Sequence, residues 1–186
     1  MKVAIYGSAG DSEPKVNEYA REVGKSLAEH GHVVITGASP GAPFEAVKVA
    51  FNNGGRVIGY SPATNLKDHI KRFGDPVECF SELLFIPKNY EYANNMMACY
   101  KYRNIRTVMN CDKVIIIGGR YGTLDEFIQA YEFGREIGVL KNTGGAAEII
   151  ATEIMESTFK KIHKDTGAKV YFEDDPAKLL LAMKLI

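Results

Sequence analysis

The sequence predicts an α/β protein in which a doubly wound parallel β-sheet carries helices on both faces, and three observations support this fold class. Short runs rich in Val and Ile alternate with segments of helical periodicity. The runs are almost continuously apolar, as expected for strands that are covered on both sides. Small-residue loops follow three of the runs, at residues 7–10, 37–41 and 118–123. We expect about seven strands in one domain that spans residues 1–186.

The expected elements follow one another in a regular order. Pro14 suits the first turn of the first helix, and Gly31 suits its end. Residues 61–81 are polar and break the rhythm, so we expect an irregular or partly helical excursion there. The strands are expected at residues 2–6, 33–35, 56–60, 83–86, 113–117, 138–140 and 170–172. The later helices are expected at residues 90–110, 149–162 and 176–185, with another completed by residues 127–135.

The charge balance argues against a nucleic-acid partner or a membrane surface. Lys and Arg together number 23, as do Asp and Glu, so the formal net charge is zero and any anion site must be local. The three cysteines, Cys79, Cys99 and Cys111, form no C-x-x-C pair and have no histidine at zinc spacing, so we expect neither disulfides nor a metal site. With no secretory signal pattern and no apolar run of membrane-spanning length, we expect a cytoplasmic protein.

The loop at residues 118–123 is the strongest candidate for a binding site. An apolar run at residues 115–117 leads into Gly118, Gly119 and Gly122, and a helical pattern follows. Glycines allow a ligand to approach the backbone closely, and the free N–H groups at a helix start attract anions. In open parallel sheets ligands bind beyond the carboxyl ends of the strands, where all three small-residue loops are expected to meet. A phosphate group is therefore the expected ligand.

Thr123 and Glu126 also admit a purely structural interpretation. Their spacing fits the S/T-x-x-E capping box, in which both side chains satisfy free N–H groups at a helix start. This fragment alone leaves the two interpretations open.

Two common nucleotide-binding patterns are not matched. Gly7 and Gly10 follow the first strand, but the second strand ends at Thr36 and Gly37 without the carboxylate that holds a dinucleotide ribose. No Gly-Lys-Ser/Thr follows any glycine loop, so a Walker A motif is missing as well. We therefore disfavour an NAD-dependent dehydrogenase and expect no bound cofactor.

Several spaced motifs resemble those of the Lonely Guy family, phosphoribohydrolases that are often mislabelled as lysine decarboxylases. Residues 118–126 resemble the family motif PGGxGTxxE, and Arg103 lies where the family carries the arginine of its upstream helix. Residues 7–10 and 36–41 resemble the family's first and second glycine loops. Two departures stand out: Gly118 replaces the proline, and Arg120 replaces the second glycine. Residues 102–104 also read Tyr-Arg-Asn instead of Glu-Arg-Lys.

This pattern resembles a divergent branch of the Rossmann-like SLOG superfamily, which includes DNA-processing proteins and molybdenum cofactor carriers. The resemblance implies a Rossmann-like homodimer that hydrolyses the N-glycosidic bond of a nucleoside 5′-monophosphate. It implies catalytic roles for Arg103 and Glu126. It further implies phosphate or nucleotide contacts from Gly7, Ser8, Gly37, Ser39, Gly119, Arg120, Gly122 and Thr123.

Alternatives remain at this stage. Ser8 and Ser39 also suit turns as small residues, and Arg103 also suits a solvated helix face. The protein could hold a nucleotide or a pterin-type phosphate cofactor without cleaving it. A pyridoxal-phosphate decarboxylase is rejected, because no lysine lies at an obvious cofactor position near the glycine loop.

Overall fold

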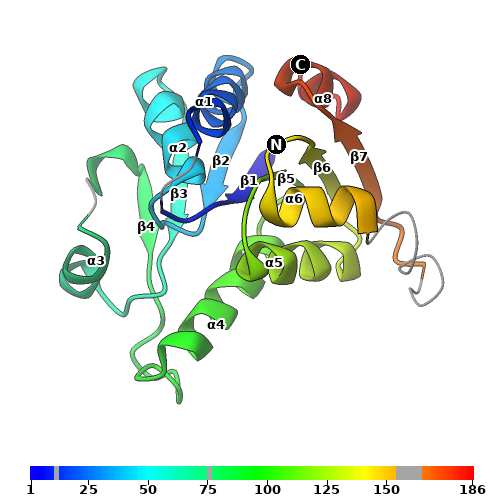
Figure 1. The fold of residues 1–186 in the computed structure, drawn as a ribbon. Coiled ribbons are helices and arrows are strands. Elements are labelled where there is room, and N and C mark those ends of the chain that lie inside the picture. Colours follow the sequence, from blue (N-terminus) through cyan, green and yellow to red (C-terminus); the bar gives the residue numbers. More distant parts are fainter. Residues whose placement is uncertain (11–12, 75–76, 154–164) are drawn as a thin grey trace.

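The computed structural model describes residues 1–10, 13–74, 77–153 and 165–186, and this part of the chain forms a seven-stranded, all-parallel sheet (Figure 1). The strand order is β4-β3-β2-β1-β5-β6-β7. The α/β Rossmann-like fold predicted from the sequence is thereby confirmed. The strands are β1 (Lys2–Gly7), β2 (Val33–Thr36), β3 (Val57–Tyr60), β4 (Glu82–Leu84), β5 (Lys113–Ile117), β6 (Glu136–Leu140) and β7 (Lys169–Glu173).

Helices cover both faces of the sheet. Successive strand residues point to opposite sides, so apolar strands leave both faces apolar and in need of cover. On β1, Val3 and Ile5 join the core on one face, whereas Ala4 and Tyr6 join the core on the other. In Figure 1 the first face carries α1 (Pro14–Glu29), α2 (Ala42–Asn52) and α8 (Pro176–Ala182). The second face carries α4 (Met96–Met109), α5 (Tyr121–Glu132) and α6 (Gly145–Ile149).

The strand order reverses between β1 and β5, which lie side by side in the middle of the sheet. Chain order runs outward in one direction from β1 to β4 and in the other from β5 to β7. Gly7 pairs with Ile117 at the carboxyl ends of these two central strands. In open α/β sheets a ligand crevice forms at this point of reversal. The first and third small-residue loops therefore begin next to each other.

The structure corrects several predicted boundaries. The helix predicted at residues 90–110 begins only at Met96, because the Asn95 side chain accepts hydrogen bonds from the amides of Met97 and Ala98 and so caps the helix start. The fourth strand covers Glu82–Leu84 instead of residues 83–86, the closing helix ends at Ala182, and the sixth strand begins earlier, at Glu136.

The polar excursion is partly helical, as predicted. It contains α3 (Leu66–Phe73) and a short 3₁₀ turn, η1 (Val77–Cys79), and α3 lies beside the edge of the sheet in Figure 1. The helix predicted at residues 149–162 falls largely on residues 154–164, outside the described part of the chain. Among the described residues, no helix combines the length and apolar character needed to cross a lipid bilayer.

Candidate functional site

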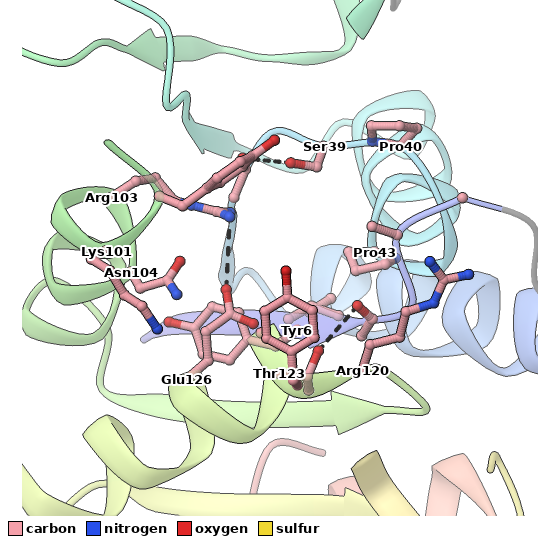
Figure 2. Close-up of a pocket in the computed structure, with 18 of the residues that line it drawn as sticks. Tyr6, Ser39, Pro40, Pro43, Lys101, Arg103, Asn104, Arg120, Thr123 and Glu126 are labelled. Atoms are coloured by element: carbon pink, nitrogen blue, oxygen red, sulfur yellow. Dashed lines mark hydrogen bonds and ion pairs between the residues drawn. The ribbon is translucent and has the colours of Figure 1, made fainter. Parts of the chain in front are cut away.

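A cavity of about 440 Å³ opens where the loops after β1, β2 and β5 meet (Figure 2). Cavities of this size accommodate small-molecule ligands. Helices α4 and α5 supply most of the remaining wall. The lining residues are Ile5, Tyr6, Gly7, Ala9, Gly10, Gly37, Ser39, Pro40, Pro43, Phe73, Met97, Tyr100, Lys101, Arg103, Asn104, Arg120, Tyr121, Gly122, Thr123 and Glu126.

The glycine loop after β5 is hydrogen-bonded to the first turn of α6 and to the loop before it. The Gly118 amide donates a hydrogen bond to Thr143 Oγ1 at 2.8 Å. The amides of Ala146 and Ala147 donate to the carbonyl oxygens of Gly119 and Gly118, at 2.9 and 3.1 Å. Gly118 and Gly119 have φ angles of 63° and 105°, which favour glycine over any residue with a Cβ. The predicted glycine turn is therefore held by these hydrogen bonds in a backbone conformation that requires glycine.

The start of α5 leaves amide groups available to a ligand. Arg120 occupies the N-cap position without a capping side chain, and its carbonyl oxygen accepts from Thr123 and Leu124. No backbone acceptor is present within the described chain for the amides of Tyr121 and Gly122, both of which line the cavity. A helix N-terminus with free N–H groups is a suitable anion site.

The capping-box interpretation of Thr123 and Glu126 is wrong. Thr123 lies inside α5 and not at its N-cap, and its hydroxyl donates to the carbonyl oxygen of Gly7 at 3.2 Å. This bond ties α5 to the end of β1. Glu126 makes no hydrogen bond to the backbone at the helix start among the described residues, and it faces the cavity instead. Thr123 therefore joins α5 to the loop after β1, and Glu126 contributes to the cavity wall.

Glu126 is a buried acidic residue that faces the buried, positively charged Arg103. Glu126 is 7% exposed and Arg103 is 9% exposed. Glu126 Oε1 lies 3.9 Å from Arg103 Nη1, and a dashed line marks this ion pair in Figure 2. Burial raises the pKa of Glu126 from 4.5 to about 7, although the charge of Arg103 opposes this rise. The carboxyl group therefore titrates near neutral pH, which suits general acid or base chemistry.

Arg103 is positioned by a close approach of its helix to the loop after β2. Its guanidinium packs directly against Gly37 and lies 5.5 Å from the centre of the Tyr100 ring. Its Nε atom is buried and has no hydrogen-bond partner among the residues that the structure describes. The interpretation of Arg103 as a solvated helix charge is thus wrong, since the side chain is enclosed.

The structure brings most of the predicted site residues to one cavity. Eight of the ten line it: Gly7, Gly37, Ser39, Arg103, Arg120, Gly122, Thr123 and Glu126. Ser8 and Gly119 do not, because the Ser8 hydroxyl accepts the Gly119 amide at 2.9 Å and both are used in bracing the loop. The Ser39 hydroxyl donates to the Gly37 carbonyl oxygen at 3.3 Å within its own turn.

Some lining residues were missed at the level of sequence. Tyr6 is the residue before the last one of β1, and its hydroxyl donates to Thr107 Oγ1 at 2.8 Å. Tyr100 and Asn104 lie on α4 on either side of Arg103. The helical spacing of Tyr100 and Arg103, three residues apart, was a signal that could have identified Tyr100. Among the described residues, no group of three or more His, Cys, Asp or Glu side chains is arranged to hold a metal ion.

Fold and cavity together define a Rossmann-like protein with a glycine loop and a cavity at the reversal point of its sheet. Residues 1–180 match the model of the SLOG cluster4 family, and the chain belongs to this family. A relative from Archaeoglobus fulgidus, named only as an uncharacterised protein, is 30% identical over 141 residues, which cover 76% of this chain and 80% of the relative.

Solved structures share the fold at low sequence identity. The structural-genomics target TM1055 superposes with a TM-score of 0.79 at 22% identity, covering 100% of this chain and 99% of that one. The molybdenum cofactor carrier protein of Chlamydomonas reinhardtii gives a TM-score of 0.67 at 23% identity, with 98% and 95% coverage. DNA processing protein A of Helicobacter pylori, which binds single-stranded DNA, gives 0.59 at 18%, with 100% and 73% coverage.

Proposed function

We propose that this protein hydrolyses the N-glycosidic bond of a nucleoside 5′-monophosphate, giving the free base and ribose 5-phosphate. The observation that carries the proposal is the enclosed Arg103–Glu126 pair, 3.9 Å apart, in a cavity that also contains the free amides of α5. The resemblance of residues 118–126 to the phosphoribohydrolase motif supports the same reaction.

The phosphate is assigned to the start of α5. The amides of Tyr121 and Gly122 are available there, and the helix dipole favours a negative group. Arg120 adds a positive charge at the cavity wall, on the opposite side from Arg103 in Figure 2. Tyr100, Met97 and Phe73 provide an aromatic and apolar wall that suits a flat heterocyclic base.

Glu126 is assigned to the ribose and the attacking water. In this reaction water adds to C1′ of the ribose, the C1′–N bond breaks, and its electron pair leaves with the base, which takes up a proton. Positive charge develops on the sugar in the transition state, where an ionised carboxylate stabilises it. The same carboxylate accepts a proton from the water, and its pKa of about 7 suits that role.

A second candidate function is binding of a phosphate-bearing cofactor without cleavage. The structural likeness to a molybdenum cofactor carrier and to a molybdenum cofactor binding protein from Rippkaea orientalis supports it, the latter with a TM-score of 0.71 at 19% identity and with 98% and 94% coverage. The missing Glu and Lys beside Arg103 also favour it, since two side chains of the hydrolase motif are replaced by Tyr102 and Asn104.

Base release distinguishes the two candidates. Purified protein is incubated with AMP, GMP, CMP and UMP, and free base is measured by chromatography. We expect release from at least one nucleotide, and a decrease of at least about 100-fold in kcat for Glu126→Gln, with AMP binding retained in calorimetry. The control is Glu132→Gln, which replaces an exposed acidic residue on the same helix. This variant should change neither kcat nor AMP binding. Binding without release from any of the four would instead favour the carrier.

We also propose that the protein forms a homodimer through α4. Met97, Ile105 and Met109 lie on one face of this helix and are each about half exposed. Met97 also lines the cavity, so a second copy here would border the site. Light scattering should give the dimer mass, and Ile105→Glu should give the monomer. Leu181→Glu on α8, on the other face of the sheet, is the matched control and should remain dimeric.

A further inference from the structure

Asp125 links the helix that carries Arg103 to the helix that carries Glu126. Its Oδ1 lies 2.8 Å from Lys101 Nζ, and its Oδ2 accepts a hydrogen bond from Asn104 Nδ2 at 2.9 Å. Lys101 and Asn104 belong to α4 and lie on either side of Arg103 in the sequence, whereas Asp125 directly precedes Glu126 on α5. A third donor, Gln129 Nε2, lies on α5 itself at 2.9 Å from Oδ2.

The carboxylate of Asp125 is suited to this link because it stays ionised. Burial raises its pKa, but hydrogen bonds from Lys101, Asn104 and Gln129 outweigh burial and lower the pKa below the usual value. An ionised carboxylate can only accept hydrogen bonds, so the amide NH₂ of Asn104 must face it. Charge-assisted hydrogen bonds of this kind are stronger than neutral ones.

Arg103 and Glu126 form an ion pair but no hydrogen bond. The Nη1–Oε1 separation of 3.9 Å is too long for one, and no hydrogen bond from the Arg103 guanidinium is present within the described chain. The separation therefore depends on where α4 and α5 place the two side chains. The two contacts between Asp125 and α4 are side-chain bonds that join the two helices directly beside the pair.

We propose that Asp125 is a positioning residue, which ties α4 to α5 on both sides of Arg103 and thereby fixes the separation of Arg103 and Glu126. Its importance for catalysis rests on the proposed function, but the positioning itself does not. The competing interpretation is an ordinary stabilising ion pair between helices, which would add stability without setting the geometry of the pair.

Several charged groups surround Glu126 and must be included in any titration. Arg103 and Lys101 face it from α4, and both lower its pKa. Asp125, its neighbour on α5, raises it. Tyr6 lies on β1, and its own pKa is raised by burial first and by Cys111 and Glu126 in addition, so it is neutral near pH 7. A single substitution at Asp125 therefore changes the pKa of Glu126 directly, and only a comparison of pairs isolates the geometry.

The test is a double-mutant cycle on the pKa of Glu126, measured by NMR with ¹³C-labelled glutamate side chains and without substrate. In the otherwise unchanged protein, Arg103→Met removes a nearby positive charge and should raise this pKa by about 1 to 3. In the Asp125→Asn background we expect less than half of that rise, because the two groups are no longer held close. In the Gln129→Ala background, which removes the bond within α5 and keeps both bonds to α4, the full rise should remain.

Lys101→Met provides a second route in case Asp125→Asn does not fold. Lys101 is a half-exposed side chain, and its removal breaks one of the two bonds to α4. In the Lys101→Met background we also expect Arg103→Met to raise the pKa of Glu126 by less than it does in the otherwise unchanged protein. An equal rise in all backgrounds, with only the melting temperature lowered, would reduce Asp125 to a stabilising ion pair. Because the titration needs no turnover, this result is independent of whether the protein cleaves any nucleotide.

Discussion

Gly37 and Arg103 are in direct contact, and the contact leaves no space for a side chain at position 37. A Cβ built there would lie 1.1 Å from Arg103 Nη1. Gly37 follows β2, whereas Arg103 lies on α4, so the contact joins two segments that are far apart in the sequence. The glycine is required by this packing and not by its own backbone, because its φ angle is not positive.

Gly37→Ala should therefore displace the Arg103 guanidinium while the fold is kept. We expect kcat/KM for base release to fall by about 10- to 100-fold, the range for a misplaced active-site group. The double variant Gly37→Ala, Arg103→Met should lose no more activity than Arg103→Met alone, since both changes act through the same group. Additive losses would show that Gly37 acts in another way.

The pH dependence of base release should report the ionisation of Glu126. Since the ionised form stabilises positive charge and accepts a proton, kcat/KM should rise with pH through a midpoint near 7, the pKa of the buried carboxyl. Arg103→Met should move this midpoint upward, because Arg103 favours the ionised form. A flat profile between pH 5 and 8.5 would exclude Glu126 as the titrating group.

Stability should depend on pH through the same residue. The folded-state pKa of about 7 lies above the ordinary value of 4.5, so the stabilising preference for the protonated form is complete below pH 4.5 and is lost as pH rises through 7. The loss amounts to roughly 3 kcal/mol, since a pKa difference of one corresponds to about 1.4 kcal/mol. Glu126→Gln should consequently melt several degrees higher than the unchanged protein at pH 8 and close to it at pH 4.5, in differential scanning calorimetry.

Thr123 should contribute to stability through its bond to the end of β1. Thr123→Val keeps the shape but removes the hydrogen bond to the Gly7 carbonyl oxygen, which should lower the free energy of unfolding by about 1 to 3 kcal/mol in urea denaturation. Thr123→Ser keeps the hydroxyl and should retain most of the stability. If Thr123→Val kept full stability while Thr123→Ser lost it, the methyl group rather than the hydroxyl would be responsible.

The fold could be predicted from the sequence because its signals are local. Apolar runs such as residues 113–117 mark buried strands, and the small-residue loops mark their carboxyl ends. The start of α4 was predicted too early because residues 90–95 continue a helix-like pattern, and only the hydrogen bonds of Asn95 show where the helix begins. The expected excursion after β3 was recognised by its polarity, but its helix α3 was not located.

The site was harder to predict, because its decisive contacts are between distant segments. The motif located Arg103 and Glu126, but only the structure shows that Thr123 bonds to Gly7 and that Ser8 is bonded to the Gly119 amide. Nothing in the sequence around Asp125 indicates that it bonds to α4 on both sides of Arg103. Such roles follow from the crossing of two helices, which one sequence does not reveal.

Because the glycine loop is hydrogen-bonded to α6, the side of the loop that faces α6 differs in polarity from the opposite side. The carbonyl oxygens of Gly118 and Gly119 both accept amides from the first turn of α6, so they face that helix. The N–H group of a trans peptide points opposite to its carbonyl, so the Arg120 amide, in the same peptide unit as the Gly119 oxygen, is directed away from α6. The side turned from α6 therefore presents this N–H group and not the two oxygens, so we expect an anion to be favoured there over a cation by the backbone alone.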